Sequence, residues 1–226
     1  MLEPLVIAVA LRPLSADFLN ADGVGHQQPA VHKFKADLIQ LAANSKRREE
    51  QQLGRGLRRQ LLASYLAVEP KLLDFAQHEF GKPYLKNYTQ VEFSQSHCTD
   101  QFVLVMNKQA VAIGVDIESK HRAIKLQALA ARILTANELK QFEQVIDQQA
   151  FLLKIWTIKE AVLKASGLGI RINLNTLESH AVFKGIGQVL HKDIGQWSYQ
   201  CVETSTHYYT VAWLGSVQQP IEFRLI

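Results

Sequence analysis

Apolar residues in the first third of the chain follow two different periods. The run Leu5 to Leu11 is continuously apolar and predicts a strand, whereas Gly54 to Val68 carries leucines at the three- and four-residue spacing of an amphipathic helix. Pro70 ends that helical pattern, because proline has no backbone N–H to donate. Residues 12–32 are polar and interrupted by glycine and proline, which is typical of a loop, and residues 33–41 have a weak helical pattern.

The middle of the chain begins with short extended segments. Phe102 to Met106 and Ala110 to Ile117 are two apolar runs joined by Asn107-Lys108-Gln109, a pattern that predicts a β-hairpin. Before them, Phe75 to Leu85 is expected to be extended and interrupted at its Gly-Lys-Pro sequence, and Val91 to Ser94 to form a short strand.

Helices are expected next, over residues 124–134, 136–145 and 151–170. Thr135 precedes the second of these, and Glu138 follows three residues later, which is the spacing of a capping box.

The third helix carries the most unusual polar pattern. Trp156, Glu160 and Lys164 are spaced four residues apart and therefore lie along one side of it, and Gly167 follows as a helix stop. On its own this pattern also fits a core helix with an exposed Glu160–Lys164 ion pair, which would contribute only about 0.2–0.5 kcal/mol.

The last third of the chain returns to β-branched and alternating apolar residues, which favour strands. Strands are expected at residues 179–183, 197–204, 208–214 and 221–225. Strands and helices thus occur in two successive groups, and this order favours an α+β fold over an alternating parallel sheet. We expect two similar halves, residues 1–112 and 113–226.

The composition is that of a soluble globular protein. The 226 residues are 47% hydrophobic and 20% charged, with a formal net charge of +4. This mild excess of positive charge indicates an anionic partner. Nucleic acid is not favoured, because the basic stretch around residues 46–59 lacks interleaved aromatic residues. No apolar run approaches the ~18 residues that cross a membrane, so no membrane partner is expected.

Two cysteines, Cys98 and Cys201, stand about a hundred residues apart and show no metal-binding spacing. A reducing compartment is therefore the default expectation. The apolar run at the N-terminus follows Glu3 and no basic segment, which makes it a poor signal peptide. We expect a cytoplasmic protein.

Asp116 and Glu118 lie in the sequence Gly-Val-Asp-Ile-Glu at the end of an apolar run. Residues two apart in a strand point to the same face, so the two carboxylates are expected to project together. Such a pair suits a hard cation such as Mg²⁺, which takes one or two protein carboxylates together with phosphate and water. Two solvated acids at a strand end are the simpler alternative.

Ser96 and His97 follow a predicted strand. No Gly-x-Ser-x-Gly sequence surrounds Ser96, so a nucleophilic serine is not indicated. Both side chains can donate a hydrogen bond to an anion, and a phosphate contact is the functional interpretation. An ordinary loop histidine is the alternative.

Taken together and in this order, four motifs carry a resemblance to a known family. They are Gly81-Lys82-Pro83, Phe93-Ser94-Gln95-Ser96-His97, Gly114-Val115-Asp116-Ile117-Glu118, and Trp156-Thr157-Ile158-Lys159-Glu160-Ala161-Val162-Leu163-Lys164. The chain resembles the 4′-phosphopantetheinyl transferases of the long, surfactin-synthetase-activating (Sfp-type) class, over about residues 40 to 185. Ser94 stands where the family usually has asparagine, and Cys98 where it usually has serine or threonine.

The resemblance implies two α+β halves packed as an intramolecular pseudo-dimer, with coenzyme A between them. It implies an enzyme with holo-[acyl-carrier-protein] synthase activity. Such an enzyme moves 4′-phosphopantetheine from coenzyme A to a serine of an apo acyl, polyketide or peptidyl carrier protein, with Mg²⁺ or Mn²⁺, and releases 3′,5′-ADP. Because that class carries both halves in one chain, a monomer is expected.

The resemblance also implies roles for individual residues. The metal ligands would be Asp116, Glu118 and Glu160, and the catalytic residues Glu160, Lys164 and His97. The residues that bind coenzyme A would be Lys46, Arg47, Arg55, Lys82, Pro83, Ser96, His97, Lys159 and Lys164. A non-catalytic module that binds coenzyme A or a carrier protein is the competing hypothesis.

Overall fold

The computed structural model describes residues 5–14, 37, 41, 43, 45–215 and 221–226. The loop expected at 12–32 and the weak helix at 33–41 fall almost entirely outside the described residues. Among the described residues, no helix is long and apolar enough to cross a membrane.

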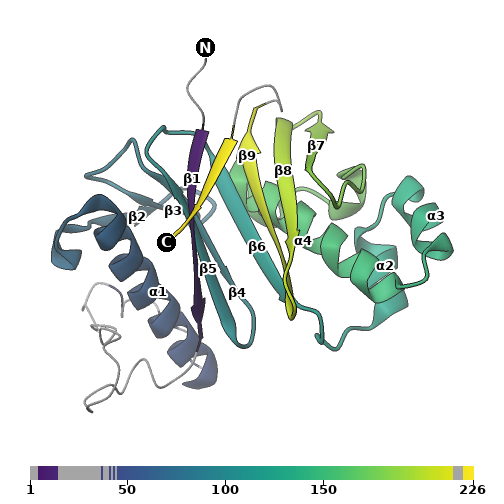
Figure 1. Cartoon of the computed structure of the whole chain (residues 1–226), viewed down its shortest axis with the longest axis horizontal. Helices are drawn as coiled ribbons and strands as arrows, with labels where there is room; N and C mark the ends of the chain where they lie inside the picture. Colours follow the sequence, from purple (N-terminus) through teal and green to yellow (C-terminus); the bar gives the residue numbers. More distant parts are fainter. Residues whose placement is uncertain (1–4, 15–36, 38–40, 42, 44, 216–220) are drawn as a thin grey trace.

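Ten strands and four α-helices make up most of the described part of the chain (Figure 1). The strands are β1 Leu5–Pro13, β2 Phe75–Gln77, β3 Pro83–Leu85, β4 Glu92–His97, β5 Gln101–Asn107, β6 Ile113–Ser119, β7 Ile186–His191, β8 Gly195–Glu203, β9 His207–Leu214 and β10 Ile221–Leu225. The helices are α1 Ser45–Leu66, α2 Leu126–Ile133, α3 Ala136–Gln144 and α4 Gln148–Ser166. Single 3₁₀ turns occur at Pro70–Leu72, Gly169–Arg171 and Leu174–Thr176.

Two four-stranded sheets form the centre of the molecule, and helices cover their outer faces (Figure 1). The first sheet has the order β10-β1-β5-β4, and α1 packs its leucines Leu53 and Leu57 against Phe102 and Leu104 of β5. The second sheet has the order β6-β9-β8-β7, and α4 packs against it. The inner faces of the two sheets bury their apolar residues against each other. The α+β architecture is therefore confirmed.

Alternation along β6 explains how the two layers are joined. Ile113, Val115 and Ile117 are buried between the sheets, so Gly114 and Asp116 face α4. Glycine is required at position 114, because a Cβ there would lie 2.0 Å from the carbonyl oxygen of Ala161. The Gly-x-Asp spacing thus brings a strand close to a helix and directs a carboxylate at that same helix.

We expect Gly114→Ala to destabilise the protein by about 3 kcal/mol, since inserting an atom into a packed interior costs roughly 1–3 kcal/mol and the obstacle here is helix backbone. The measurement is urea unfolding followed by circular dichroism. Gly54→Ala is the matched control, because a Cβ there would lie 3.7 Å from the nearest atom and Gly54 is inside α1. That control should be neutral or stabilised by about 0.5–1 kcal/mol. Equal urea concentrations at the unfolding midpoint for the two variants would contradict the close packing of β6 on α4.

Three predictions of secondary structure were wrong. The two runs joined by residues 107–109 are not a hairpin, because β5 pairs with β1 and β4, whereas β6 pairs with β9 in the other sheet. The hairpin is formed by β4 and β5 instead. Residues 179–183 form a turn region and not a strand, and strand β7 was not predicted.

The helix ends agree with their sequence signals. Thr135 and Glu138 form a capping box at α3, in which each side chain binds the backbone of the other residue. Gly167 ends α4 in the left-handed conformation, with a φ of 73°.

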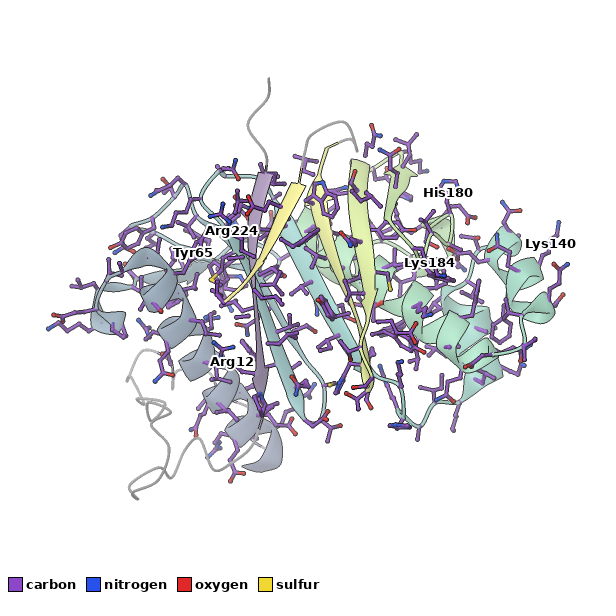
Figure 2. All side chains as sticks on the ribbon, viewed as in Figure 1. Arg12, Tyr65, Lys140, His180, Lys184 and Arg224 are labelled. Carbon is purple, nitrogen blue, oxygen red and sulfur yellow. The ribbon has the colours of Figure 1, made fainter. Side chains whose placement is uncertain are left out.

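The last strand, β10, belongs to the first sheet, although it follows the strands of the second sheet in the sequence. It pairs in parallel with β1 in the first sheet, where Leu5 is opposite Ile221. Arg224 of β10 lies beside Tyr65 of α1 at this edge (Figure 2). Residue 112 does separate β5 from β6, which lie in different sheets, but the final strand crosses back. The division into 1–112 and 113–226 stays a proposal.

Candidate functional site

The candidate site lies where β4, at the edge of the first sheet, approaches β6, at the edge of the second sheet. Ser94 and Ser96 stand on β4, and the Ser94 hydroxyl accepts a hydrogen bond from the backbone N–H of Val115 on β6. This contact holds the two edges together. The serine that departs from the family's usual asparagine therefore has a structural partner.

Asp116 lies at the centre of this junction. It is 5% exposed, and its Oδ1 accepts hydrogen bonds from Ser96 Oγ at 2.8 Å and from Lys164 Nζ at 2.7 Å. Lys164 Nζ is also 2.8 Å from Ser96 Oγ. Asp116 Oδ2 is buried and has no hydrogen-bond partner among the described residues. One carboxylate oxygen is thus satisfied by the protein, and the other lacks the partner that a buried charge requires.

Glu118 and Glu160 complete a group of three acids. Burial and the charge of Asp116 raise the pKa of Glu118 to about 7, and the same two causes raise the pKa of Glu160. Arg122 forms an ion pair with Glu118, and Arg122 and the Trp156 indole both oppose the rise in its pKa. Mutual repulsion of this kind is relieved by a bound cation.

The carboxylate oxygens of Asp116, Glu118 and Glu160 do not all lie within 4.8 Å of one another, so they do not form a preformed metal site. In the described part of the chain, the only set of three or more metal-type ligand atoms within 4.8 Å of one another is Cys98, Asp100 and His207. Asp116, Glu118 and Glu160 share one side of the junction, while Glu118 is held by Arg122. A cation would therefore have to draw Glu118 from its arginine partner.

His97 is exposed at the end of β4, next to Ser96. Desolvation lowers the pKa of His97, and nearby Lys164 lowers it further, whereas Glu50 and Asp116 act in the opposite direction. A pocket of about 490 Å³ lies in front of it and is also lined by Glu50, Glu118 and Arg122. The histidine is therefore placed to donate to an anion that enters between the halves.

Lys82 and Pro83 lie on the other side of Lys164. A pocket of about 250 Å³ is lined by both of them together with Ser94 and Lys164. The Lys82 ammonium already donates to Glu92 at 3.2 Å and to the carbonyls of Ile113 and Ala165. Lys82 thus contacts residues of both halves and donates a hydrogen bond to a carbonyl in the last turn of α4. It also lines the pocket.

The basic residues of α1 divide into two places. Arg55 lines a pocket of about 310 Å³ with Arg58, Phe75 and Pro83. Arg47 is exposed at the start of α1, and Lys46 is in the same first turn but its side chain is outside the described atoms. Of the predicted basic residues of α1 whose side chains are described, Arg55 lies in a pocket with Pro83 and Arg47 does not.

Lys159 is a correction. It is fully buried, and its Nζ contacts Glu138 Oε2 at 2.5 Å and the carbonyl oxygens of Ile133 and Leu174 at 2.6 and 2.9 Å. All of its donors are used on the side of α4 that faces α2 and α3. Its neighbour Glu160 projects from a different side of α4, since adjacent residues on a helix are about 100° apart. The predicted role of Lys159 in binding coenzyme A was therefore wrong.

Three further residues belong to the site but were not among the predicted site residues. Arg58 is 8% exposed, lies 4.2 Å from the centre of the Phe75 ring, and has a buried Nε with no hydrogen-bond partner among the described residues. Burial lowers its pKa to about 10. Arg122 forms an ion pair with Glu118, and Trp156 opposes the rise in its pKa. The sequence shows Arg58 as one of several arginines, and both Arg58 and Arg59 lie over the Phe75 ring, so only the buried, unpartnered Nε distinguishes Arg58.

The fold and this junction define a class: a two-sheet α+β protein with acids and a lysine placed between its halves for a charged ligand. Residues 112–214 match the family model described as the 4′-phosphopantetheinyl transferase superfamily. This match covers β6 and α4, which carry Asp116, Glu118, Glu160 and Lys164. Over these residues the chain is similar to this superfamily, in agreement with the resemblance that the four motifs carry.

Curated relatives agree with this similarity. The 4′-phosphopantetheinyl transferase HetI of Nostoc sp. is 34% identical over 122 residues, which are 52% of this chain and 51% of the relative. The 4′-phosphopantetheinyl transferase Sfp of Bacillus subtilis is 25% identical over 126 residues, 55% of this chain and 54% of the relative. The matches thus span about half of the length of each relative.

A solved structure has a lower similarity. The holo-[acyl-carrier-protein] synthase (AcpS) of Thermotoga maritima aligns with 47% of this chain and 65% of its own, with a TM-score of 0.40 and 21% identity.

Proposed function

We propose that the chain transfers the 4′-phosphopantetheine group of coenzyme A to a serine hydroxyl of an apo carrier protein and releases 3′,5′-ADP. The observation that carries this proposal is the hydrogen-bonded group of Asp116, Lys164 and Ser96 at the junction of the halves. Transfer of a phosphoryl group depends mainly on positioning and on neutralising charge, which such a group can provide. The chain needs no nucleophile of its own, because the attacking serine belongs to the carrier.

We assign a Mg²⁺ ion, with Mn²⁺ as an alternative, to Asp116, Glu118 and Glu160. The unpartnered, buried Asp116 Oδ2 suits a hard cation, whose ligands are oxygen atoms. The raised pKa values of Glu118 and Glu160 support the same assignment, since burial and the charge of Asp116 outweigh the nearby cations Arg122 and Lys164. When bound, the ion would neutralise charge on the pyrophosphate of coenzyme A.

In this proposal, different parts of coenzyme A bind in the pockets on either side of Lys164. Lys164, Ser96 and His97 would donate to the pyrophosphate. Pro83 lines both the pocket beside Lys164 and the pocket of Arg55 and Arg58, so an adenosine placed there would direct its 3′-phosphate at those arginines. Arginine binds phosphate through paired N–H donors. Lys46 and Arg47 stay predictions for the same phosphate.

Glu160 would take the proton of the attacking serine. Its raised pKa brings it nearer to neutral pH than an ordinary carboxylate, and a general base works best with a pKa near the operating pH. Glu160 also lines a separate pocket of about 350 Å³ with Trp156, Arg132 and Arg171. The two arginines would suit the acidic surface of a carrier protein. The cytoplasmic location and the monomeric state stay predictions.

The affinity for Mg²⁺ should rise as the pH rises through about 7. Glu118 keeps its proton below its raised pKa, and a protonated carboxyl is a poor ligand, so protons and Mg²⁺ compete for it. Isothermal titration calorimetry one pH unit below and one unit above that value measures the change. We expect about tenfold tighter binding at the higher pH, because one proton is released per ion. Glu118→Gln should remove most of this dependence, and a flat profile in the native protein would contradict the assignment.

The function is tested by incubating the protein with coenzyme A, Mg²⁺ and a panel of purified apo carrier proteins from fatty-acid, polyketide and peptide synthesis. The expected result is that the mass of at least one carrier rises by the mass of one phosphopantetheine group. Binding of coenzyme A without a mass gain on any carrier would favour the competing hypothesis of a non-catalytic binding module.

A further inference from the structure

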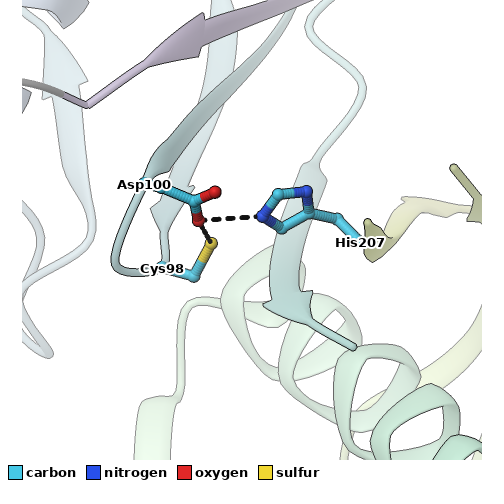
Figure 3. Close-up of side chains that lie close together, drawn as sticks. All are labelled: Cys98, Asp100 and His207. Carbon is cyan, nitrogen blue, oxygen red and sulfur yellow. Dashed lines mark hydrogen bonds and ion pairs between the residues drawn. The ribbon is translucent and has the colours of Figure 1, made fainter. Parts of the chain in front are cut away.

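Cys98, Asp100 and His207 form a second cluster of polar side chains, apart from the three acids. Cys98 and Asp100 belong to the turn between β4 and β5, and His207 begins β9 in the other sheet. Asp100 Oδ1 lies 3.5 Å from Cys98 Sγ and 2.9 Å from His207 Nε2, and the three ligand atoms all lie within 4.8 Å of one another. Figure 3 shows the thiol and the imidazole directed at the same carboxylate oxygen.

The donor set matches the preferences of zinc. Cysteine sulfur, histidine nitrogen and a carboxylate oxygen are its usual ligands, at about 2.0–2.3 Å, and ligand atoms arranged tetrahedrally at those distances lie roughly 3.3–3.5 Å apart. The observed sulfur–oxygen distance of 3.5 Å already has this value, and the nitrogen–oxygen distance of 2.9 Å needs to open by a few tenths of an ångström. Mg²⁺ prefers oxygen ligands alone, so this cluster and the three acids select different ions.

The surroundings of His207 support a ligand role. The residue is 5% exposed, and its Nδ1 lies 2.8 Å from the hydroxyl of Thr206. A histidine that binds a metal through one ring nitrogen almost always donates from the other, and this second contact fixes the orientation of the ring. Here Nε2 faces the cluster and Nδ1 faces the threonine.

We propose that Cys98, Asp100 and His207 bind a Zn²⁺ ion that joins the β4–β5 turn of the first sheet to the start of β9 in the second. Water completes the tetrahedron, because Asp100 is exposed and Cys98 lines the pocket of about 490 Å³ in front of His97. On binding, the Cys98 thiol gives its proton to solvent and sulfur bonds to zinc. The proton that His207 Nε2 donates to the Asp100 carboxylate moves through solvent to Nδ1, where the Thr206 hydroxyl accepts it, so binding to a neutral imidazole and the thiol releases one proton per ion.

A catalytic thiol is a different use of the same residues, and the geometry disfavours it. The carboxylate lies between sulfur and imidazole, so the histidine does not contact the thiol that it would have to deprotonate. Burial also raises the pKa of Cys98 to about 11, the reverse of an activated cysteine. A metal lowers that pKa by bonding to the thiolate.

Cobalt substitution tests the site without coenzyme A or a carrier, so its outcome is independent of the proposed function. In a Cys201→Ser background Cys98 is the sole thiol, because the chain has two cysteines. Adding Co²⁺ to this protein after dialysis against a chelator should produce sulfur-to-cobalt charge-transfer absorption that saturates at one equivalent. Zn²⁺ should abolish the absorption and raise the midpoint of thermal unfolding.

Three variants separate the site from adventitious binding. Cys98→Ser should remove the absorption and the thermal shift, and Asp100→Asn, at an exposed position, should weaken Co²⁺ binding by at least about tenfold while the fold is kept. His191→Asn is the matched control, because His191 is also a buried histidine near an aspartate, Asp193, but no cysteine joins them in a cluster. It should behave as the parent does. Absence of the absorption in the Cys201→Ser protein, or equal binding by Asp100→Asn, would overturn the proposal.

Discussion

Asp116→Asn should lower the rate of carrier modification by about a thousandfold and leave the protein folded. Asparagine keeps an oxygen that can accept from Ser96 and Lys164, so the hydrogen bonds of the junction survive. It loses the negative charge that the proposed Mg²⁺ ion needs. Removing one preorganised electrostatic contact from an active site typically costs about 10²–10³ in rate, and the loss of a ligand belongs at the upper end.

The rate is measured as carrier mass gained per unit time, and folding by circular dichroism. Asp193→Asn is the control, since Asp193 is 60% exposed and lies away from the junction. The charge of Asp116 also raises the pKa of both Glu118 and Glu160. Both pKa values should therefore fall in Asp116→Asn, which carboxyl-resolved NMR titration can follow. A fully active Asp116→Asn protein at ordinary Mg²⁺ would disprove the ligand assignment.

Lys159→Met should destabilise the protein by about 3–5 kcal/mol, the range expected when one partner of a buried ion pair is removed. Methionine fills a similar volume but leaves the buried Glu138 carboxylate without its cation and the carbonyls of Ile133 and Leu174 without a donor. Burial lowers the pKa of Lys159, and the Glu138 carboxylate opposes this, so the ammonium depends on its partner. Urea unfolding monitored by tryptophan fluorescence gives the free energy.

The double variant Lys159→Met with Glu138→Gln should recover part of the loss, because no unpaired charge then stays buried. Lys154→Met is the control, since Lys154 is on the same helix and forms an ion pair with Glu203, which is 49% exposed. Exposed pairs contribute roughly 0–1 kcal/mol. Coenzyme A affinity per folded molecule should be unchanged in Lys159→Met. A loss of affinity with unchanged stability would restore the role that the motif suggested for Lys159.

The case of Lys159 shows where a motif and a structure disagree. In the sequence, Lys159 and Glu160 are adjacent polar residues in one motif. Lys159 was assigned to coenzyme A, and Glu160 to the metal ion and to catalysis. On a helix the two side chains project from different sides. Lys159 forms a buried ion pair because Glu138 of α3 lies opposite it. A residue more than twenty positions away in the chain determines the outcome, so spacing inside the motif does not reveal it.

Strand pairing is a second feature that the local sequence did not predict correctly. The apolar runs on either side of residues 107–109 were correct as strands but were assigned to each other, because a short polar link between two such runs usually makes a hairpin. The link instead carries the chain from one sheet to the other. Local hydrophobicity specifies that a strand forms, and it does not specify which edge the strand joins.

What the sequence determined by itself was local or carried by spacing: the α+β class, the capping box at Thr135, the stop at Gly167, and a resemblance to a superfamily carried by four motifs. Periods of two and of about 3.6 residues place side chains on faces, which is why Asp116 could be predicted to lie with Glu118, and Glu160 with Lys164. That these two pairs share one site was implied only by the resemblance. Tertiary structure alone decided which distant faces meet. It buried Lys159 against Glu138, placed Arg58 beside Phe75, and brought His207 to Cys98 and Asp100 across more than a hundred residues. Contacts of that separation come from the packing of the whole fold, and no local period in the sequence records them.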